Sequence, residues 1–378
     1  MKILILEPYY GRSRKRFLEG LVAHSRHETQ VISMSARYWQ WRLQGGAVTL
    51  ANKAIETLEN GFSPDVVFAS DMVNLAAFKA LTNGRFTGIP MVMYFHNNRL
   101  TYPLSPAEHR DPAFGYINYL SALVADQLVF NSQSHLQEFT DALPAFLGTY
   151  PDYTHLEKTQ EIRQKSRVLH RGISLKQFDA FSDAAEPINW GVGMKPPIIL
   201  WNHRWEYDQN PHAFFRLLNR LDDVGCKFRL ILAGEHFNEA NEFGQSFSRF
   251  ADRILHYGYA EDSEEYGRLL QRAHLVVSTA VHEFFGVTLL EAIYCGCHPL
   301  LPNKLTYPEL LPSALHRPLL HAPTLYQNED DLFDIMQSIL KGQERPLPQQ
   351  TLRSIPEHLD WKTQIRAFDA LFEEIAPT

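Results

Sequence analysis

Short runs of apolar and β-branched residues recur along the whole chain, and the segments between them space their apolar residues as helices do. The runs predict strands in the first half at 2–6, 30–34, 66–70, 91–96, 127–131 and 167–169, and in the second half at 198–202, 228–233, 254–257, 275–279 and 298–301. Such runs alternating with helices are typical of parallel sheets covered on both faces by crossover helices. The pattern therefore predicts an α/β protein with two doubly wound, Rossmann-like domains.

Breaks in this pattern indicate where the domains end. Residues 183–197 are rich in Pro, Gly and Ala, and they are expected to link an N-terminal domain at 1–185 to a C-terminal domain at 190–345. A second break at 341–348 precedes an amphipathic segment and predicts a C-terminal helix within 356–378. Ligands of open α/β sheets bind beyond the carboxyl ends of the strands, so two facing domains would hold ligands in a cleft between them. Residues directly after strands are therefore the first candidates for function.

Composition and charge narrow the class of protein. The 378 residues are 45% hydrophobic and 21% charged, as in ordinary globular proteins. The net charge is −7, with +2 on residues 1–185 and −9 on residues 186–378, so the first half is the better candidate for meeting a polyanion. Three cysteines favour a reducing compartment without a disulfide framework. No apolar stretch approaches the ~18 residues of a membrane span, and the opening run is too short for a signal peptide, so we expect a cytoplasmic protein.

The strongest chemical signal is a pair of glutamates, Glu283 and Glu291. The pair follows the predicted strand at 275–279 and enters a helix, where backbone N–H groups and the positive end of the dipole suit a diphosphate or a sugar hydroxyl. Glu291, two turns into this helix, could accept hydrogen bonds from a ribose diol. Two surface glutamates are the alternative, but the strand-to-helix context favours a nucleotide-sugar site. The residues expected to line the donor between them are Phe285, Gly286 and Val287.

A second signal follows the first predicted strand of the second half, in the stretch from Trp201 to Pro211. Arg204 could direct its guanidinium fork at phosphate oxygens, a bidentate geometry that favours Arg over Lys. Pro211 at an expected helix start completes a strand–loop–helix arrangement that suits a phosphate. An exposed loop arginine is the alternative interpretation.

Together, these features of residues 197–310 resemble the C-terminal half of GT-B glycosyltransferases of the family-4 type. The shared features are an arginine after the first strand, glycines after the second and third strands, and the glutamate pair. The residues that carry them here are Arg204, Gly234, Gly258, Tyr259, Glu283 and Glu291.

The resemblance implies a role for each of these side chains. Glu283 would contact the donor sugar, Glu291 the ribose and Arg204 the diphosphate. Such enzymes usually hold the diphosphate with a lysine as well, but this chain has Gln209 near the expected position. His203 could partly take the place of the missing lysine.

Segments 7–15, 37–42, 68–75 and 94–103, together with the stretch from Trp201, resemble the tRNA-queuosine mannosyltransferase family. That family has an acidic residue after the histidine of the last N-terminal segment, where this chain has Asn97. The resemblance implies a GT-B fold with two Rossmann-like domains facing across a cleft. It further implies a retaining transfer of mannose from GDP-mannose to the cyclopentenediol of queuosine in tRNA, without a metal cofactor.

Two first-half residues that follow strands are candidates for the donor site or the catalytic centre. Gly11 could let the backbone approach a substrate closely. His96 could hydrogen-bond the donor sugar or the acceptor, and it joins Glu283 and Arg204 as a candidate catalytic residue. A simple turn glycine and a structural histidine are the alternatives.

The first half also contains the candidate contacts to tRNA. Basic side chains suit phosphates, and the rings of Tyr38, Trp39 and Trp41 could stack on unpaired bases. A solvated helix face and core tryptophans are the alternative. The residues expected to meet the acceptor or the tRNA are Arg12, Arg14, Lys15, Arg16, Arg37, Trp39, Arg42, Asp71, Asn74, Asn97 and Asn98.

Two other functions stay open on the sequence. The first is a glycosyltransferase with another donor, or with a glycan or small-molecule acceptor; a lipid-linked acceptor should bring an amphipathic helix that the first domain does not show. The second is a non-catalytic nucleotide-sugar or RNA-binding protein, which the retained Arg204, Glu283 and Glu291 argue against. The 17 histidines show no metal-ligand spacing, so no metal is expected. The sequence does not determine the oligomeric state.

Overall fold

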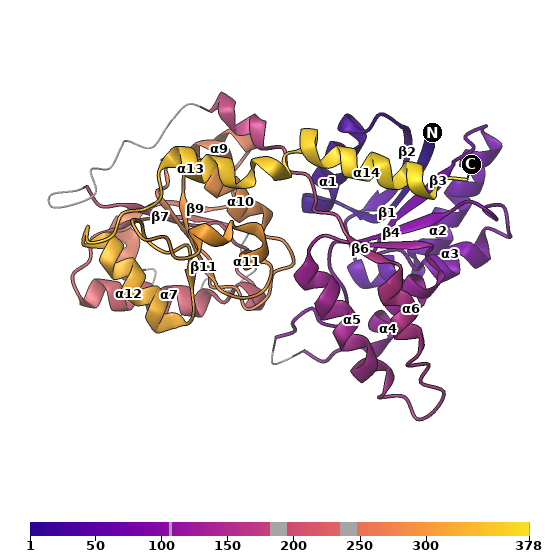
Figure 1. Cartoon of the computed structure of the whole chain (residues 1–378), viewed down its shortest axis with the longest axis horizontal. Coiled ribbons are helices and arrows are strands. Elements are labelled where there is room, and N and C mark those ends of the chain that lie inside the picture. Colours follow the sequence, from indigo (N-terminus) through magenta and orange to yellow (C-terminus); the bar gives the residue numbers. More distant parts are fainter. Residues whose placement is uncertain (106–107, 182–194, 235–247, 378) are drawn as a thin grey trace. The chain divides into compact units, whose positions relative to one another are not determined.

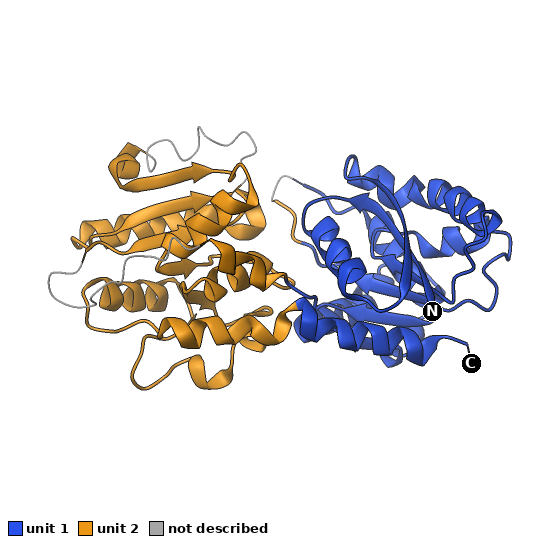
Figure 2. Ribbon diagram, turned by 90° about the horizontal axis from the view of Figure 1, so that it is seen from above, with its two compact units in different colours: residues 1–102, 106–173, 361–378 blue, residues 103–105, 174–360 orange. Residues whose placement is uncertain are grey.

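The computed structural model describes residues 1–105, 108–181, 195–234 and 248–377. The chain forms two compact units (Figure 2), each built on one six-stranded parallel sheet. Unit 1 comprises Met1–Tyr102, Pro106–Ile173 and Trp361–Thr378, and unit 2 comprises Pro103–Ser105 and Ser174–Asp360. The two predicted Rossmann-like domains are therefore confirmed.

The main transition between the units lies at Ile173 and Ser174, before the boundary predicted at 185–190. Most of the predicted linker, 183–197, lies outside the described residues.

The sheet of unit 1 has the strand order β2-β1-β3-β4-β5-β6, with every neighbouring pair parallel. All six strands match predicted runs to within a few residues. They are β1 (Lys2–Tyr10), β2 (Glu28–Ser35), β3 (Val66–Ser70), β4 (Met91–Phe95), β5 (Gln127–Phe130) and β6 (Ser166–Val168).

Helices cover both faces of this sheet because its strands are apolar on both sides (Figure 1). In β1, Ile3 and Ile5 pack with α1 and α14, whereas Leu4 and Leu6 pack with α2 to α5. The period of two along a strand places these pairs on opposite faces. The helices are α1 (Arg12–His24), α2 (Trp39–Glu59), α3 (Leu75–Leu81), α4 (Pro112–Val124), α5 (Gln133–Leu147), α6 (Lys158–Gln164) and α14 (Trp361–Ile375).

The predicted C-terminal helix forms as α14, but it belongs to unit 1 rather than standing apart. Its first residue, Trp361, is 1% exposed and lies against two glycines. A Cβ on Gly20 would lie 1.9 Å from the Trp361 Nε1 atom, and one on Gly172 would lie 2.1 Å from Cδ2. The indole therefore fills a space that only glycine leaves open, and this packing joins α14 to α1.

The sheet of unit 2 has the order β12-β11-β10-β7-β8-β9 and is also parallel throughout. Five strands match predicted runs, and the sixth, β12, has only two residues and was not predicted. The strands are β7 (Ile198–Trp201), β8 (Arg229–Ala233), β9 (Ile254–Gly258), β10 (Leu275–Val277), β11 (His298–Pro302) and β12 (Leu325–Tyr326).

Two groups of helices pack in unit 2. Helices α7 and α12 contact each other and share a core with the strands, while α10 contacts α9 and α13. The α-helices are α7 (Pro211–Asp223), α9 (Ser263–Arg272), α10 (Val287–Tyr294), α11 (Tyr307–Leu310), α12 (Glu329–Leu340) and α13 (Gln349–Ser354). Short 3-10 helices lie at Leu175–Ala180, Tyr207–Gln209, Ala251–Arg253, Ser313–Leu315 and Ile355–Leu359. Among the helices of the described residues, none combines the length and the apolar character needed to cross a bilayer.

Replacing the buried indole tests how α14 is attached. Trp361→Ala should lower the free energy of unfolding of unit 1 by ~3–5 kcal/mol, because the cavity between the two glycines cannot close fully. Hydrogen exchange followed by mass spectrometry would report the loss of protection in β1 and β4. The matched control is Trp41→Ala, whose side chain is 62% exposed and whose removal should change stability by less than ~0.5 kcal/mol. Equal effects of the two substitutions would contradict the proposed packing.

Candidate active site

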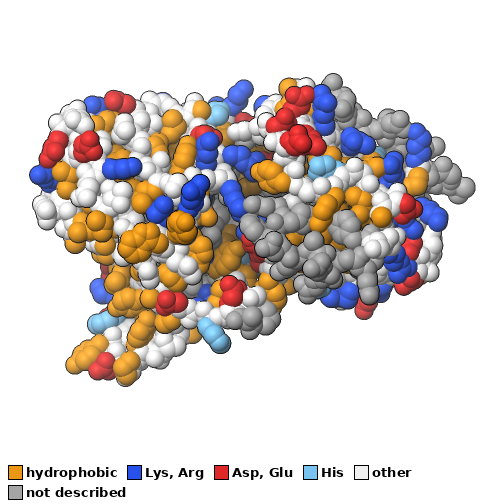
Figure 3. Space-filling model, turned by 180° about the vertical axis from the view of Figure 1, so that it is seen from behind, with side chains coloured by type: hydrophobic (Ala, Val, Ile, Leu, Met, Phe, Trp, Pro, Cys, Tyr) orange, Lys and Arg blue, Asp and Glu red, His pale blue; other side chains and the backbone are white. Residues whose placement is uncertain are grey.

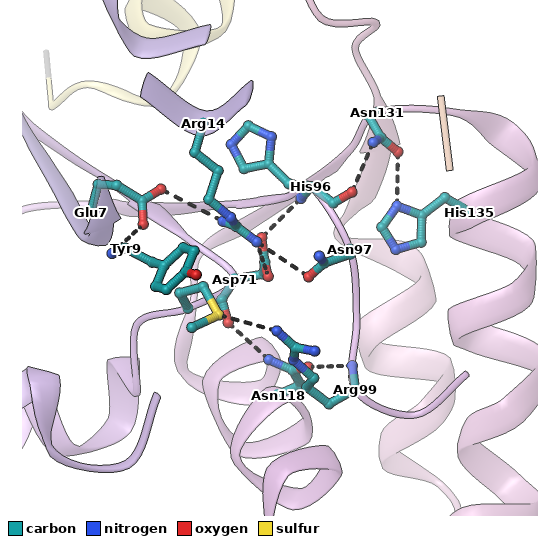
Figure 4. Close-up of polar contacts among 11 residues, drawn as sticks. Glu7, Tyr9, Arg14, Asp71, His96, Asn97, Arg99, Asn118, Asn131 and His135 are labelled. Atoms are coloured by element: carbon teal, nitrogen blue, oxygen red, sulfur yellow. Dashed lines mark hydrogen bonds and ion pairs between the residues drawn. The ribbon is translucent and has the colours of Figure 1, made fainter. Parts of the chain in front are cut away.

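Two neighbouring strands, β1 and β3, and the first turn of α1 bring charged side chains together in unit 1 (Figure 4). Glu7 lies in β1, Asp71 directly follows β3, and Arg14 reaches both from the first turn of α1. One Arg14 nitrogen donates to Asp71 Oδ2 at 2.8 Å, and the other lies 3.6 Å from Glu7 Oε2. We call Glu7, Arg14 and Asp71 the ion cluster.

The ion cluster is dry, with exposed fractions of 0% for Glu7, 6% for Arg14 and 1% for Asp71. Burial raises the pKa of Glu7, although Arg14 and the backbone N–H of Tyr9 oppose the shift. Burial disfavours the charge on Arg14, but the Asp71 and Glu7 carboxylates more than offset it and raise the pKa of Arg14. Arg14 therefore stays charged, and its guanidinium forms ion pairs with both carboxylates.

This burial corrects one prediction. Arg14 was expected on the tRNA surface with its basic neighbours, but it faces the interior while Arg12, Lys15 and Arg16 are exposed. The helical periodicity explains the difference, because Arg14 lies on the same side of α1 as the buried Phe17 and Leu18.

Asp71 also fixes the backbone around His96. Its Oδ1 accepts a hydrogen bond from the His96 N–H at 2.9 Å, and the Asn131 amide donates to the His96 carbonyl at 3.0 Å. Asn131 in turn lies 2.8 Å from the Nδ1 atom of His135. The backbone N–H and the backbone carbonyl of His96 are therefore both held by side chains, one from a residue that follows β3 and one from a residue that follows β5.

The His96 imidazole packs edge-on against the stacked rings of Phe17 and Tyr94, whose centroids are each 4.8 Å away. Burial lowers the pKa of His96 well below its ordinary value, and the positive charges of Arg14 and Arg171 add to the shift. The ring is thus neutral at physiological pH. Its Nδ1 atom has no hydrogen-bond partner among the described residues, so a ligand hydroxyl could satisfy it.

The asparagines predicted for acceptor binding have different surroundings. Asn97 Oδ1 accepts from Arg14 at 3.2 Å, which places Asn97 beside the ion cluster. Asn98 is fully buried and its Oδ1 accepts from the backbone of Leu100, while Asn74 caps α3. Asn98 is therefore corrected to a structural role in the loop, Asn74 has a local capping role, and Asn97 remains the candidate for contact with a ligand.

Sequence analysis missed Asn118 and Arg99, which extend the same network. The Asn118 amide donates to the Asp71 carbonyl at 2.9 Å and its oxygen accepts from the Arg99 N–H at 2.9 Å. The Arg99 guanidinium lies over the ring of Trp39, 3.9 Å from the ring centroid. Trp39 also packs on Phe114 and is half-buried, so its indole supports the loop and is not presented openly for stacking on a base.

Gly11 has a packing role that the sequence did not reveal. A Cβ there would lie 2.5 Å from the Cβ of Ala36, so the loops after β1 and β2 touch at this point. Arg37 is exposed directly after Ala36, whereas Arg42 donates to the Ser35 carbonyl at 3.1 Å. On the face of unit 1 that Figure 3 shows, Lys and Arg side chains lie beside exposed hydrophobic ones.

In unit 2, the predicted donor loop precedes α10. Gly286 is the N-cap of this helix and adopts a left-handed conformation at φ 82°, which favours glycine. Glu283 is half-buried in the loop and accepts a hydrogen bond from the Phe285 N–H at 3.1 Å through Oε1. Phe285 is buried and Val287 half-buried. The loop between β10 and α10 thus contains a half-buried carboxylate and leads into a helix start.

Glu291 is 2% exposed, one of the few buried carboxylates of unit 2. Its Oε2 accepts a hydrogen bond from the Tyr266 hydroxyl at 3.0 Å, and the Asn202 amide lies 3.3 Å from that hydroxyl. Asn202 Oδ1 is buried without a hydrogen-bond partner among the described residues. Glu291, Tyr266 and Asn202 therefore form a polar set that suits hydroxyl groups, although only Glu291 was predicted.

Arg204 follows β7, as predicted, but it lies between two carboxylates. It forms ion pairs with Glu206 and with Asp208, the latter at 3.4 Å. Gln209, which stands where the lysine was expected, is buried and donates to Asp208 at 2.9 Å. A diphosphate at Arg204 would have to compete with these carboxylates.

The remaining predicted donor residues line the ends of β8 and β9. A Cβ on Gly234, directly after β8, would lie 1.8 Å from the carbonyl oxygen of His203, which follows β7. The chain segments after β7 and β8 therefore touch through their backbones at this point. Gly258 has a left-handed φ of 112° and nothing near its missing side chain, and Tyr259 is exposed beside it. Within the described residues, no group of three or more His, Cys, Asp or Glu side chains is arranged to hold a metal ion.

His203 does not replace the missing lysine, contrary to the hypothesis drawn from the sequence. It is 5% exposed, and burial, aided by the Arg204 charge, lowers the pKa of His203 to about 4 despite contacts with Val277 and Gln209. At neutral pH the ring is uncharged and contributes no positive charge to a diphosphate.

The depressed pKa of His203 predicts a pH dependence of stability. At a pH below ~6.5, His203 is protonated in the unfolded chain but stays neutral in the native protein until the pH reaches about 4. The free energy of unfolding therefore falls as the pH drops from ~6.5 to about 4. The loss amounts to roughly 3 kcal/mol at most for this group. Urea titrations at several pH values should show that His203→Gln flattens the dependence for unit 2. An unchanged pH profile would contradict the assignment of a neutral His203.

Models of two protein families match the chain. Residues 2–173 match the family described as tRNA-queuosine alpha-mannosyltransferase N-terminal, and residues 184–349 match glycosyl transferases group 1. The tRNA-queuosine alpha-mannosyltransferase of Drosophila melanogaster is 33% identical over 313 residues, which cover 82% of this chain and 81% of that protein.

Solved structures show the same architecture at low sequence identity. Sucrose-phosphate synthase from Thermosynechococcus elongatus has a TM-score of 0.69 at 14% identity, with 99% of both chains covered. The apo structure of OtsA has a TM-score of 0.68 at 11% identity and covers both chains completely. The apo form of the lipopolysaccharide galactosyltransferase WaaB has a TM-score of 0.67 at 13% identity, covering 99% of this chain and 100% of that one. These similarities bear on the fold alone, which is the predicted GT-B type.

Proposed function

The chain belongs to the tRNA-queuosine alpha-mannosyltransferase family, and on this premise we propose that it transfers mannose from GDP-mannose to queuosine in tRNA. It is a glycosyltransferase, with a family match in each half. The observation that carries the proposal is the 33% identity over 313 residues, a length that exceeds either unit and therefore includes parts of both.

The donor loop of unit 2 supports a nucleotide sugar. The start of α10 behind Gly286 offers backbone N–H groups to an anion. Glu283, near this helix start, would accept hydrogen bonds from hydroxyls of the sugar. Glu291, held by Tyr266, would accept from the ribose, and Asn202 Oδ1 would gain a partner it lacks. Glu291 and Asn202 are buried, so water competes little for their hydrogen bonds to a ligand, whereas Glu283 is half-buried.

Charge at the diphosphate end comes from Arg204 and the helix start. In the absence of donor, Glu206 and Asp208 neutralise Arg204. The proposed diphosphate takes over the guanidinium through charge-assisted bonds, and Glu206 turns away to solvent. Because Gln209 and His203 are both neutral groups, neither adds a positive charge to that of Arg204 at this end of the site.

Unit 1 would supply the groups that meet the reacting sugar and the acceptor. A neutral His96 can accept or donate one hydrogen bond at Nδ1, which suits a hydroxyl of mannose or of the cyclopentenediol. Its fixed peptide unit provides orientation, which supplies much of the rate enhancement when no covalent intermediate forms. We expect retention at the anomeric carbon, with a donor phosphate oxygen assisting removal of the acceptor proton.

Two further expectations accompany the proposal. The reaction is expected to need no metal ion, so EDTA should leave the rate unchanged. The enzyme is expected in the cytoplasm, where its three cysteines, all free and buried, would stay reduced.

Incubation with GDP-mannose and tRNA tests the function directly. The modified nucleoside should gain the mass of one hexose on tRNA that carries queuosine, and not on tRNA that lacks it, as measured by mass spectrometry of nuclease digests. Glu283→Gln should reduce the rate by roughly 100-fold or more, because it removes a charged contact to the donor sugar. The matched control is Glu329→Gln. Glu329 is an exposed glutamate at the start of α12 and forms an ion pair with Arg216 of α7.

Parallel reactions with UDP- and ADP-sugars identify the donor. Transfer from one of these and not from GDP-mannose would overturn the donor assignment and leave the acceptor assignment standing. Transfer to tRNA without queuosine would overturn the acceptor assignment. Equal rates for Glu283→Gln and the wild type would remove Glu283 from the site.

A further inference from the structure

Two large aromatic side chains lie exposed at the start of α2 in unit 1. Tyr38, the N-cap of this helix, is 77% exposed and adopts a left-handed conformation at φ 52°. Trp41, in the first turn, is 62% exposed. A tryptophan is seldom so open to water, because its burial is worth several times that of a smaller side chain. The exposure of both rings is consistent with contact to a ligand.

The exposed indole is held in place by the helix beneath it. A Cβ on Gly45 would lie 3.0 Å from both Cη2 and Cζ2 of Trp41 and 3.2 Å from Cε2. The six-membered part of the indole thus rests on the backbone of the next helical turn, which only a glycine leaves bare. A ring that is supported in this way and yet 62% exposed presents aromatic surface with little entropy left to lose on binding.

Exposed arginines lie near this pair. Arg37 directly precedes Tyr38, and the contact of Gly11 with Ala36 brings the start of α1, which has the exposed Arg12, next to the same segment. The first turns of α1 and α2 contain no acidic residue. Aromatic rings among arginines match a chain of phosphates with unpaired bases better than they match an apolar protein surface.

Contacts within unit 1 connect this surface to the candidate catalytic histidine. Trp39 lies under the Arg99 guanidinium, Arg99 is bonded to Asn118, and Asn118 is bonded to the Asp71 carbonyl. Asp71 binds the His96 N–H. The two exposed rings therefore flank Trp39, a residue that this network connects to the group expected to meet the acceptor.

From this geometry we propose that Tyr38 and Trp41 form a stacking platform for unpaired bases of the tRNA next to the modified nucleoside. The proposal rests on the proposed function, which supplies an RNA acceptor. It narrows the stacking role expected of Tyr38, Trp39 and Trp41 to the two exposed rings, because Trp39 is half-buried. It also gives Gly45 a role, because a side chain there would push the indole of Trp41 off the helix.

Binding of the full-length protein to queuosine-containing tRNA tests the platform. Fluorescence anisotropy should give a dissociation constant roughly 5- to 100-fold weaker for Trp41→Ala and for Tyr38→Ala, as expected for the loss of a base–aromatic stack. Gly45→Val should weaken binding in the same direction while keeping the indole. Val48→Ser is the matched control, since Val48 is 53% exposed on the same helix and should not meet a base.

The salt dependence of binding separates stacking from charge. Trp41→Ala should leave the slope of log Kd against log salt unchanged, whereas Arg37→Ala should reduce its magnitude by about one. Affinities of Trp41→Ala and Tyr38→Ala equal to the wild type would overturn the platform. Weakening by Val48→Ser as strong as by Trp41→Ala would also overturn it, because it would indicate a broader apolar interface.

Two measurements on the same protein samples distinguish this proposal from the proposed function. Mannose transfer by the wild-type protein reports the function, and tRNA affinity of the variants reports the platform. Transfer by the wild type together with unaltered affinities of the variants rejects the platform alone. Selective loss of affinity in Trp41→Ala, Tyr38→Ala and Gly45→Val supports it.

Discussion

The buried contact between Arg14 and Asp71 is the interaction on which the candidate site of unit 1 depends. It joins the first helix to the ends of the central strands, in a region where all three members of the ion cluster are at most 6% exposed. A buried charge without its partner costs several kcal/mol, so loss of either side chain would destabilise the edge strongly. The contact also determines the geometry of the site, because the second oxygen of Asp71 binds the peptide N–H of His96.

The candidate site of unit 2 depends less on buried ion pairs than that of unit 1 and more on backbone groups. The loops after β7 and β8 touch where Gly234 meets the His203 carbonyl, and α10 begins at a left-handed Gly286. Gly234 lets the two loops meet through their backbones, and Gly286 supplies the left-handed residue at which α10 begins. The side chains nearby are mostly neutral or acidic, and Arg204 is paired with Glu206 and Asp208. Donor binding in this family member would therefore rely on helix N–H groups and on exchange of carboxylates around one arginine.

The sequence predicted the fold well because its information is local and periodic. Eleven of the twelve strands follow from apolar runs, and only the two-residue β12 is too short to leave a pattern. The position of α14 could not be predicted in this way. Its attachment depends on Trp361 fitting against Gly20 and Gly172, residues that are distant in sequence and unremarkable alone.

The candidate site was predicted less completely than the fold. Residues that follow strands, such as His96, Arg204 and Glu283, could be proposed because topology places each at the carboxyl edge of the sheet in its own unit. Tyr266 could not, since it lies inside a helix and meets Glu291 only in three dimensions. Arg14 was assigned to the wrong surface because a basic run does not reveal which member turns inward. His203 was given a possible charge that burial removes.

The buried ion cluster and the neighbouring aromatic rings hold His96 as a neutral, fixed hydrogen-bonding group in the candidate site of unit 1. Nitrogen-15 NMR of histidine-labelled protein tests it most directly, with the His96 signals assigned by comparison with His96→Gln. The predicted result is an imidazole that stays neutral across the range from neutral pH down to well below 6.5, the ordinary pKa of histidine. An imidazole that takes up a proton with a pKa of 6.5 or above would contradict the claim.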